Sequence, residues 1–150
     1  MVQRKRRIPI VADTNVFVRS FKTRNPASAN RRVIRLWLWE KRLQLIVSPQ
    51  VVAEYLEIFA EVLGMDAQTI EEWRLRFEED RRCTLIHLAR RYTESRDPDD
   101  NLLLATAFAG RAEYLITNDL DLLELTEDFK RTLPFAILSP QEFLTRVGAS

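Results

Sequence analysis

The sequence predicts an α/β fold, a sandwich in which helices flank a parallel β-sheet. Short apolar segments alternate along the chain with longer segments in which apolar residues recur at helical spacing. Two apolar segments are followed by Ser-Pro, at Ser48-Pro49 and Ser139-Pro140, a strong helix start because Ser caps the helix and Pro fits its first turn. Strands that alternate with helices are typical of parallel sheets with right-handed crossovers.

Five strands are expected, and the first of them is expected at the centre of the sheet. The run from Ile8 to Ala12 is almost wholly apolar and lies between a basic tail and Asp13, as expected for a strand buried on both faces. The other four expected strands span residues 45–47, 85–88, 114–116 and 135–138. His87 lies in the third strand of the chain, 85–88, and is expected to be a structural residue.

Helices are expected between these strands. The second helix should begin at Ser28 or Asn30, and its apolar pattern continues to about Leu43. Trp37, Trp39 and Trp73 lie on apolar helical stripes, which favours packing in the core or at a subunit interface over stacking on bases. The other expected helices span 16–21, 49–63 up to Gly64, and 67–82 after the cap Asp66. A further helix is opened by residues 97–101 and runs to Gly110, followed by one or two turns within 120–125 and a last helix from Pro140.

The composition is that of a single globular domain. The chain has 150 residues, 46% of them hydrophobic and 30% charged, which is enough for one substantial core. We expect a basic tail at residues 1–7 and one domain over residues 8–150. No apolar run approaches the roughly 20 residues of a membrane span, and the basic start is not followed by a secretion signal. We therefore expect a cytoplasmic protein without a membrane partner.

The residue types restrict the chemistry. Cys83 is the only cysteine and His87 the only histidine, which excludes an intrachain disulfide and a Cys/His zinc site, so any metal must be held by oxygen. Nineteen of the 23 Lys and Arg residues are Arg, whose planar fork suits phosphate. The alternative for most of these arginines is pairing with the 22 acidic residues on solvated helix faces.

Acidic residues recur where predicted strands end or helices begin. Asp13 follows the first strand, Glu54 lies in the helix after the second, Asp100 opens the helix before the fourth, and Asp119 follows the fourth. If the first and fourth strands are neighbours, these side chains converge at the carboxyl edge of the sheet. Clustered carboxylates repel unless protons or cations neutralise them, and Mg²⁺ or Mn²⁺ takes oxygen ligands. The alternative for Asp13 is a plain helix cap.

Taken together, these segments resemble the PIN domain, and most of all its VapC-like branch, the bacterial toxin components of toxin–antitoxin pairs. The resemblance covers nearly the whole chain and rests on four segments: Asp13-Thr14-Asn15, Glu54, Asp97-Pro98-Asp99-Asp100-Asn101, and Thr117-Asn118-Asp119-Leu120-Asp121-Leu122-Leu123. It implies a PIN-like three-layer sandwich with a central five-stranded parallel sheet, and a metal-dependent endoribonuclease activity.

The resemblance also implies roles for individual residues. The acidic quartet that holds Mg²⁺ or Mn²⁺ would be Asp13, Glu54, Asp100 and Asp119, with Asp99 competing with Asp100. Asp121 would be a peripheral ligand. The supporting polar residues would be Thr14, Asn15 and Thr117, while Asn118 receives no firm role. Candidates to bind flanking phosphates of the substrate are Arg19, Arg24 and Arg96.

The function expected from this resemblance is hydrolysis of RNA phosphodiester bonds by metal-activated water. The expected partners are RNA, a cognate antitoxin protein and a second copy of the chain. Two alternatives are a PIN nuclease of RNA processing that is not a toxin, and a catalytically silent module that binds RNA or a partner. A phosphatase of the open α/β type is disfavoured, because Thr14-Asn15 rather than a second acid follows Asp13.

Overall fold

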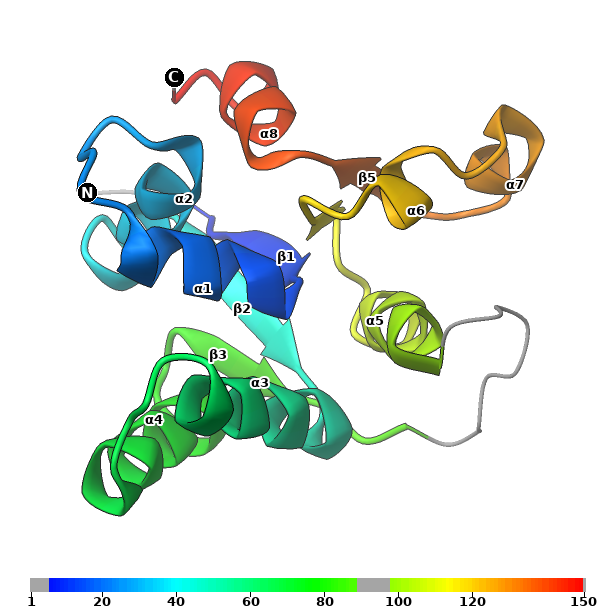
Figure 1. Cartoon of the computed structure of the whole chain (residues 1–150). Coiled ribbons are helices and arrows are strands. Elements are labelled where there is room, and N and C mark those ends of the chain that lie inside the picture. The colour runs from blue at the N-terminus through cyan, green and yellow to red at the C-terminus, as the bar shows by residue number, and fades with distance from the viewer. Residues whose placement is uncertain (1–5, 89–97, 150) are drawn as a thin grey trace, which may run out of the picture.

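The structure is a five-stranded parallel sheet flanked by helices, as the sequence predicts (Figure 1). This computed structural model describes residues 6–88 and 98–149, and the side chains of all of these except residues 98–101. The strand order is β3-β2-β1-β4-β5, and every neighbouring pair is parallel. The strands are β1 Ile8–Ala12, β2 Leu43–Val47, β3 Cys83–Leu85, β4 Tyr114–Ile116 and β5 Ala136–Leu138.

Strand β1 lies at the centre of the sheet, between β2 and β4. Ile10 pairs with Leu45 of β2 on one side and with Tyr114 of β4 on the other. The chain builds the sheet outward from β1 through β2 to β3, then returns to place β4 and β5 on the other side of β1. The order of strands therefore reverses between β1 and β4, and in open α/β sheets a crevice forms there, outside the carboxyl ends of the strands.

The helices within the described residues carry the crossovers between these strands. Ser48 and Ser139 cap the helices that follow them, as the Ser-Pro pattern predicts, and the structure adds a complete capping box between Ser139 and Glu142. None of the helices that the structure describes combines the length and the apolar character needed to cross a bilayer. The helices are α1 Thr14–Lys22, α2 Ala29–Leu38, α3 Pro49–Glu61, α4 Ala67–Glu79, α5 Pro98–Ala109, α6 Leu120–Leu123, α7 Glu127–Arg131 and α8 Pro140–Arg146.

A cluster of aromatic rings holds helices α1 to α4 together. Phe17 of α1 is fully buried, and its ring centroid lies 5.8 Å from Trp37, 4.9 Å from Tyr55, 5.7 Å from Phe59 and 5.7 Å from Phe77. Buried aromatic side chains contribute large apolar areas as well as favourable edge contacts between rings. Because α1 starts directly after β1, this cluster also fixes the position of the chain at the carboxyl end of the central strand.

The third strand and the helix before it differ from the prediction. Helix α4 ends at Glu79 rather than at residue 82, because Asp80 adopts an extended conformation and its carboxylate accepts hydrogen bonds from the backbone N–H and the guanidinium of Arg82. The strand then begins at Cys83 and ends at Leu85, where it pairs with β2, so the prediction of 85–88 is wrong. His87 is consequently exposed and lies beyond the strand.

Helix α2 is shorter than its apolar pattern predicts. It ends at Leu38, and Leu43 belongs to β2 instead. Trp37 and Trp73 are buried as expected. Trp39 is 79% exposed, so the core interpretation is wrong for this residue, and packing at a subunit interface stays a prediction. Helix α7, which begins at the cap residue Thr126, was not predicted, because it has no buried residue and therefore no apolar stripe.

The end of the expected basic tail is attached to the domain. Arg6 forms an ion pair with Glu113, and Arg7 donates hydrogen bonds to the side chain of Gln44 and to the carbonyl of Arg81. These contacts lie at the amino ends of the strands, the edge opposite to the crevice between β1 and β4.

Gly110, at the end of α5, offers a test of how closely the helix packs on the sheet. A Cβ atom at this position would lie 2.1 Å from Cγ2 of Ile46 in β2, an impossible contact. We expect Gly110→Ala to lower the free energy of unfolding by about 1–3 kcal/mol, as overpacking of cores does. Urea unfolding measures the change.

The double variant Gly110→Ala/Ile46→Ala provides the control, because it removes the methyl group that the new Cβ would meet. The two losses should then be less than additive. Fully additive losses would show that Gly110 does not pack against Ile46 as described.

Candidate active site

Asp13 lies directly after β1, in the crevice where the strand order reverses. It occupies the N-cap position of α1, but its side chain makes no capping hydrogen bond. Instead, Asp13 Oδ2 accepts hydrogen bonds from the hydroxyl of Thr117, at 2.7 Å, and from the side-chain amide of Asn15, at 3.2 Å. The carboxylate is therefore held by side chains of two segments, and the simple helix-cap interpretation does not account for its contacts.

Thr117 and Asp119 reach this position from the end of β4. The Thr117 hydroxyl is fully buried and accepts a hydrogen bond from the backbone N–H of Asp119, at 2.9 Å, while it donates to Asp13. Asp119 caps the short helix α6, where its Oδ1 accepts from the backbone N–H of Asp121 at 2.9 Å. One threonine side chain thus connects the two acidic residues that follow neighbouring strands.

The pKa of Asp13 is raised above its ordinary value. Burial is the main cause, because it disfavours the charged carboxylate, and the negative charge of Asp119 acts in the same direction. The hydrogen bond from Thr117 opposes both by stabilising the carboxylate. Such a site favours the binding of a proton or a cation.

Glu54 of α3 approaches the end of β1 beside Tyr55. The Tyr55 hydroxyl is buried and donates a hydrogen bond to the carbonyl of Ala12, the last residue of β1. Burial raises the pKa of Tyr55 well above its usual value, and the charges of Asp13 and of Glu54 raise it further. One carboxylate oxygen of Glu54 is itself buried. Both acidic side chains therefore act on a single hydroxyl group at the end of the central strand.

A chain of side-chain amides extends from Asp13 to α2. Asn15 accepts hydrogen bonds from the backbone N–H and from the side-chain amide of Asn118, at 3.2 and 3.1 Å. The same Asn118 amide donates to the side-chain oxygen of Asn30 at 2.7 Å. From sequence, Asn118 has no firm role and Asn30 is only a possible helix start, since no local pattern links positions so far apart.

The remaining predicted site residues have different surroundings. Thr14 is buried beside Asp13, and its hydroxyl has no hydrogen-bond partner among the described residues. Asp121 is exposed in the first turn of α6, Arg19 is exposed in the last turn of α1, and Arg24 is exposed just beyond it. Asp99 and Asp100 lie in the first turn of α5, but their side chains are outside the description, as is the whole of Arg96.

The donor chemistry fits a hard divalent cation. The described groups at the crevice offer carboxylate, hydroxyl and amide oxygens, the ligand types that Mg²⁺ and Mn²⁺ prefer. Within the part of the chain whose side chains are described, no three His, Cys, Asp or Glu residues form a metal-binding group. The structure thus brings together Asp13 and Asp119 and places Glu54 near the same strand end.

An open parallel sheet with acidic residues where its strand order reverses defines a class of α/β proteins that bind ligands at the carboxyl edge. The family model described as PIN domain matches residues 9–121, so the chain belongs to the PIN domain family, a family of nucleases. The fold is also similar to that in the crystal structure of VapBC2 from Rickettsia felis bound to a DNA fragment from their promoter. That match has a TM-score of 0.52 and 16% identity, and it covers 88% of this chain and 98% of that chain. Among curated proteins, none matches this sequence.

The raised pKa of Asp13 predicts a pH-dependent effect on stability. Because the folded state binds this proton more tightly than the unfolded state does, the stability that Asp13 contributes is complete below its unfolded pKa, about 4. It is lost as the pH rises through the folded pKa. We therefore expect Asp13→Asn to increase the free energy of unfolding of metal-free protein at neutral pH, with a gain that shrinks at acidic pH. Urea unfolding in chelator over a pH series measures this.

Asp128→Asn is the matched control, because Asp128 is 96% exposed and should give no comparable gain. An Asp13→Asn variant that is less stable than the wild-type protein at neutral pH would contradict this account of the site.

Proposed function

We propose that this chain is a Mg²⁺- or Mn²⁺-dependent endoribonuclease whose catalytic residues are Asp13, Glu54, Asp100 and Asp119. The observation that carries the proposal is the pair Asp13 and Asp119, which follow the two neighbouring strands at the reversal point and interact unfavourably as like charges. The repulsion between the two carboxylates lowers the stability of the fold, whereas the same concentration of negative charge attracts a cation. Membership of a nuclease family supports the same conclusion.

In the proposed reaction the chain's own residues position the charged groups. Asp13, Glu54, Asp100 and Asp119 would hold the cation, with Asp121 at its periphery. Thr117 and Asn15 hold the Asp13 carboxylate through their hydrogen bonds, which reduces its freedom before any ligand binds. When bound, the cation would supply charge neutralisation at the phosphate and a lower pKa for the attacking water.

The Thr14 hydroxyl is proposed to contact the substrate. It is buried at the first position of α1, beside Asp13, and within the described residues it has no hydrogen-bond partner. A buried hydroxyl without a partner is costly unless a ligand or water satisfies it. Of the three arginines proposed for the flanking phosphates, Arg19 and Arg24 are exposed at the end of α1, and the proposal for Arg96 rests on the sequence alone.

We further propose that the protein is the toxin of a toxin–antitoxin pair, with an antitoxin protein as partner, and that it acts in the cytoplasm as a homodimer. The support is the shared fold of this chain and of VapBC2, which was solved with its promoter DNA. A nuclease of RNA processing that is not a toxin has the same site, so the effect on bacterial growth rather than RNA cleavage distinguishes the two roles.

The nuclease proposal predicts that Asp13→Asn eliminates divalent-ion-dependent cleavage of RNA. Loss of a ligand should cost more than the roughly 10- to 100-fold seen for residues that only support metal ligands. Cleavage of labelled RNA, measured with Mn²⁺ or Mg²⁺ and again with chelator, gives the rates. In parallel, Mn²⁺ at about 100 times its Kd should stabilise the wild-type protein by about 2.7 kcal/mol.

Asp66→Asn serves as control, since Asp66 caps α4 away from the crevice and should leave cleavage unchanged. Full activity of Asp13→Asn, or equal cleavage with chelator, would refute the metal-dependent mechanism. A wild-type protein that binds Mn²⁺ and RNA without cleaving would favour the silent binding module instead.

The toxin proposal predicts that expression of the wild-type protein arrests bacterial growth and that Asp13→Asn relieves the arrest. The measurement is the growth rate after induction, with equal protein levels confirmed for both forms. Arrest by both forms would mean that growth inhibition does not come from the proposed site. Normal growth with the active wild-type enzyme would favour a role in RNA processing.

A further inference from the structure

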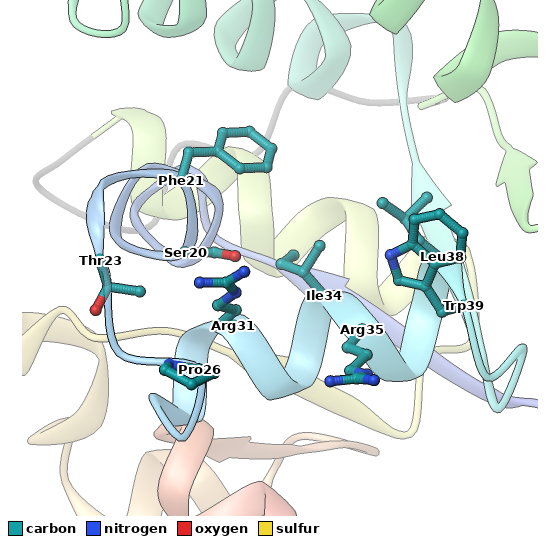
Figure 2. Close-up of a pocket in the computed structure, with 9 residues that line it drawn as sticks. All are labelled: Ser20, Phe21, Thr23, Pro26, Arg31, Ile34, Arg35, Leu38 and Trp39. Atoms are coloured by element: carbon teal, nitrogen blue, oxygen red, sulfur yellow. The ribbon is translucent and has the colours of Figure 1, made fainter.

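A groove lies between the end of α1 and the outer side of α2, away from the catalytic residues. It has a volume of about 590 Å³ and is lined by Phe21 of α1, by Ile34 and Leu38 of α2, and by the three longer side chains that project from the same region, Arg31, Arg35 and Trp39. Figure 2 shows Arg31 extending from α2 toward α1 and Trp39 at the opposite end of α2. The groove therefore runs along the whole of α2.

The segment of the chain that forms this groove has a strong excess of positive charge. Residues 19–42 contain eight Lys and Arg residues and one acidic residue, a net charge of +7, although the whole chain carries only +1. The rest of the chain is therefore negative by 6 charges. No Asp or Glu is among the residues that line the groove, all of which are described. Among the ion pairs in the described part of the chain, none includes Arg31 or Arg35. Their guanidinium groups thus remain available to an anionic ligand.

Trp39 gives the groove a feature that charge alone does not explain. Its side chain is 79% exposed, whereas Trp37 and Trp73 are only 1% and 9% exposed. Exposed aromatic rings beside cationic side chains are the elements with which proteins bind single-stranded nucleic acids, because bases stack on the ring while cations contact the phosphates. At positions 31, 35 and 39, the three side chains recur every four residues, so they project from neighbouring positions along α2.

Helix α1 connects the groove with the candidate active site, because the helix begins directly after Asp13 and its last turn lines the groove. Asn30, whose side chain accepts the hydrogen bond from Asn118, directly precedes Arg31. The amide chain from Asp13 through Asn15 and Asn118 therefore ends where the row of Arg31, Arg35 and Trp39 starts.

We infer that the groove between α1 and α2 binds single-stranded RNA on one side of the bond to be cleaved, with Arg31 and Arg35 contacting phosphates and Trp39 stacking on a base. The inference rests on the proposed function and deepens it, since it makes this groove part of the substrate site. It adds two arginines that sequence patterns place on a solvated helix face and a tryptophan that they place in the core or at a subunit interface.

The test measures RNA binding separately from cleavage. In the Asp13→Asn background, binding of a labelled, unstructured RNA of about 12 nucleotides, within the range of single-strand site sizes, is measured at several salt concentrations. The double variant Arg31→Ser/Arg35→Ser should reduce the slope of log affinity against log salt by about 1.4, or about 0.7 for each lost phosphate contact. Trp39→Ala should weaken binding about fivefold or more and should remove the quenching of exposed tryptophan fluorescence by RNA.

The matched control is Arg131→Ser/Arg146→Ser, which removes the same charge from exposed positions on α7 and α8. It should leave both the affinity and the salt slope near those of the parent. If the groove variants bind RNA like this control, the inference is wrong. It is also wrong if Trp39→Ala dissociates a dimer in sedimentation without changing RNA affinity, because the groove is then a contact between two copies.

A polyglutamate peptide distinguishes RNA from an acidic protein partner. If the peptide displaces the RNA at equal charge concentration and Trp39→Ala has no effect, the groove recognises charge alone and the inference fails. The result is independent of cleavage: RNA binding that depends on Arg31, Arg35 and Trp39 supports the groove even if the wild-type protein proves inactive. Conversely, if the wild-type protein cleaves RNA and the groove variants bind RNA with unchanged affinity, the proposed function stands and the inference about the groove is wrong.

Discussion

The parallel pairing of β1 with β4 is the constraint on which the candidate site depends. The ladder continues beyond β1, where the backbone N–H of Asp13 donates to the carbonyl of Ile116 at 2.9 Å. This fixes the register between two segments that lie 104 positions apart, and so allows the Thr117 hydroxyl to reach the Asp13 carboxylate. A change of register by one residue would turn these side chains to the other face of the sheet and separate them.

The electrostatic interactions within the site are unfavourable for folding. Burial and the charge of Asp119 both disfavour the ionised Asp13, and the Thr14 hydroxyl beside it has no hydrogen-bond partner within the described residues. Stability is supplied elsewhere, by the buried core that includes the aromatic cluster around Phe17, whose helix starts at the site. Local features that work against folding are expected at functional sites, where selection favours ligand binding over stability.

The distribution of charge gives the molecule two distinct surfaces. The candidate active-site crevice is acidic, and an RNA backbone avoids such a crevice unless a cation lies between them. The segment around the end of α1 and α2 is basic, although the nearly neutral chain does not suggest it. If both surfaces bind one substrate, the basic segment attracts the strand and the crevice contacts it only where the cation sits. The amide chain through Asn30 joins the two surfaces.

The sequence by itself determined the alternation of strands and helices, the Ser-Pro helix starts and the acidic residues at the ends of the first and fourth strands. These features are local, because each depends on residues within a few positions of one another. Tertiary structure alone decided that Cys83 to Leu85 forms the third strand, since pairing with β2 selected that register over the more apolar residues that follow. It alone decided that Trp39 is exposed, that Tyr55 faces two acids, and that Asn30 contacts Asn118. The physical reason is that burial, charge interactions and side-chain hydrogen bonds depend on which distant segments come into contact. Local sequence patterns do not specify these contacts.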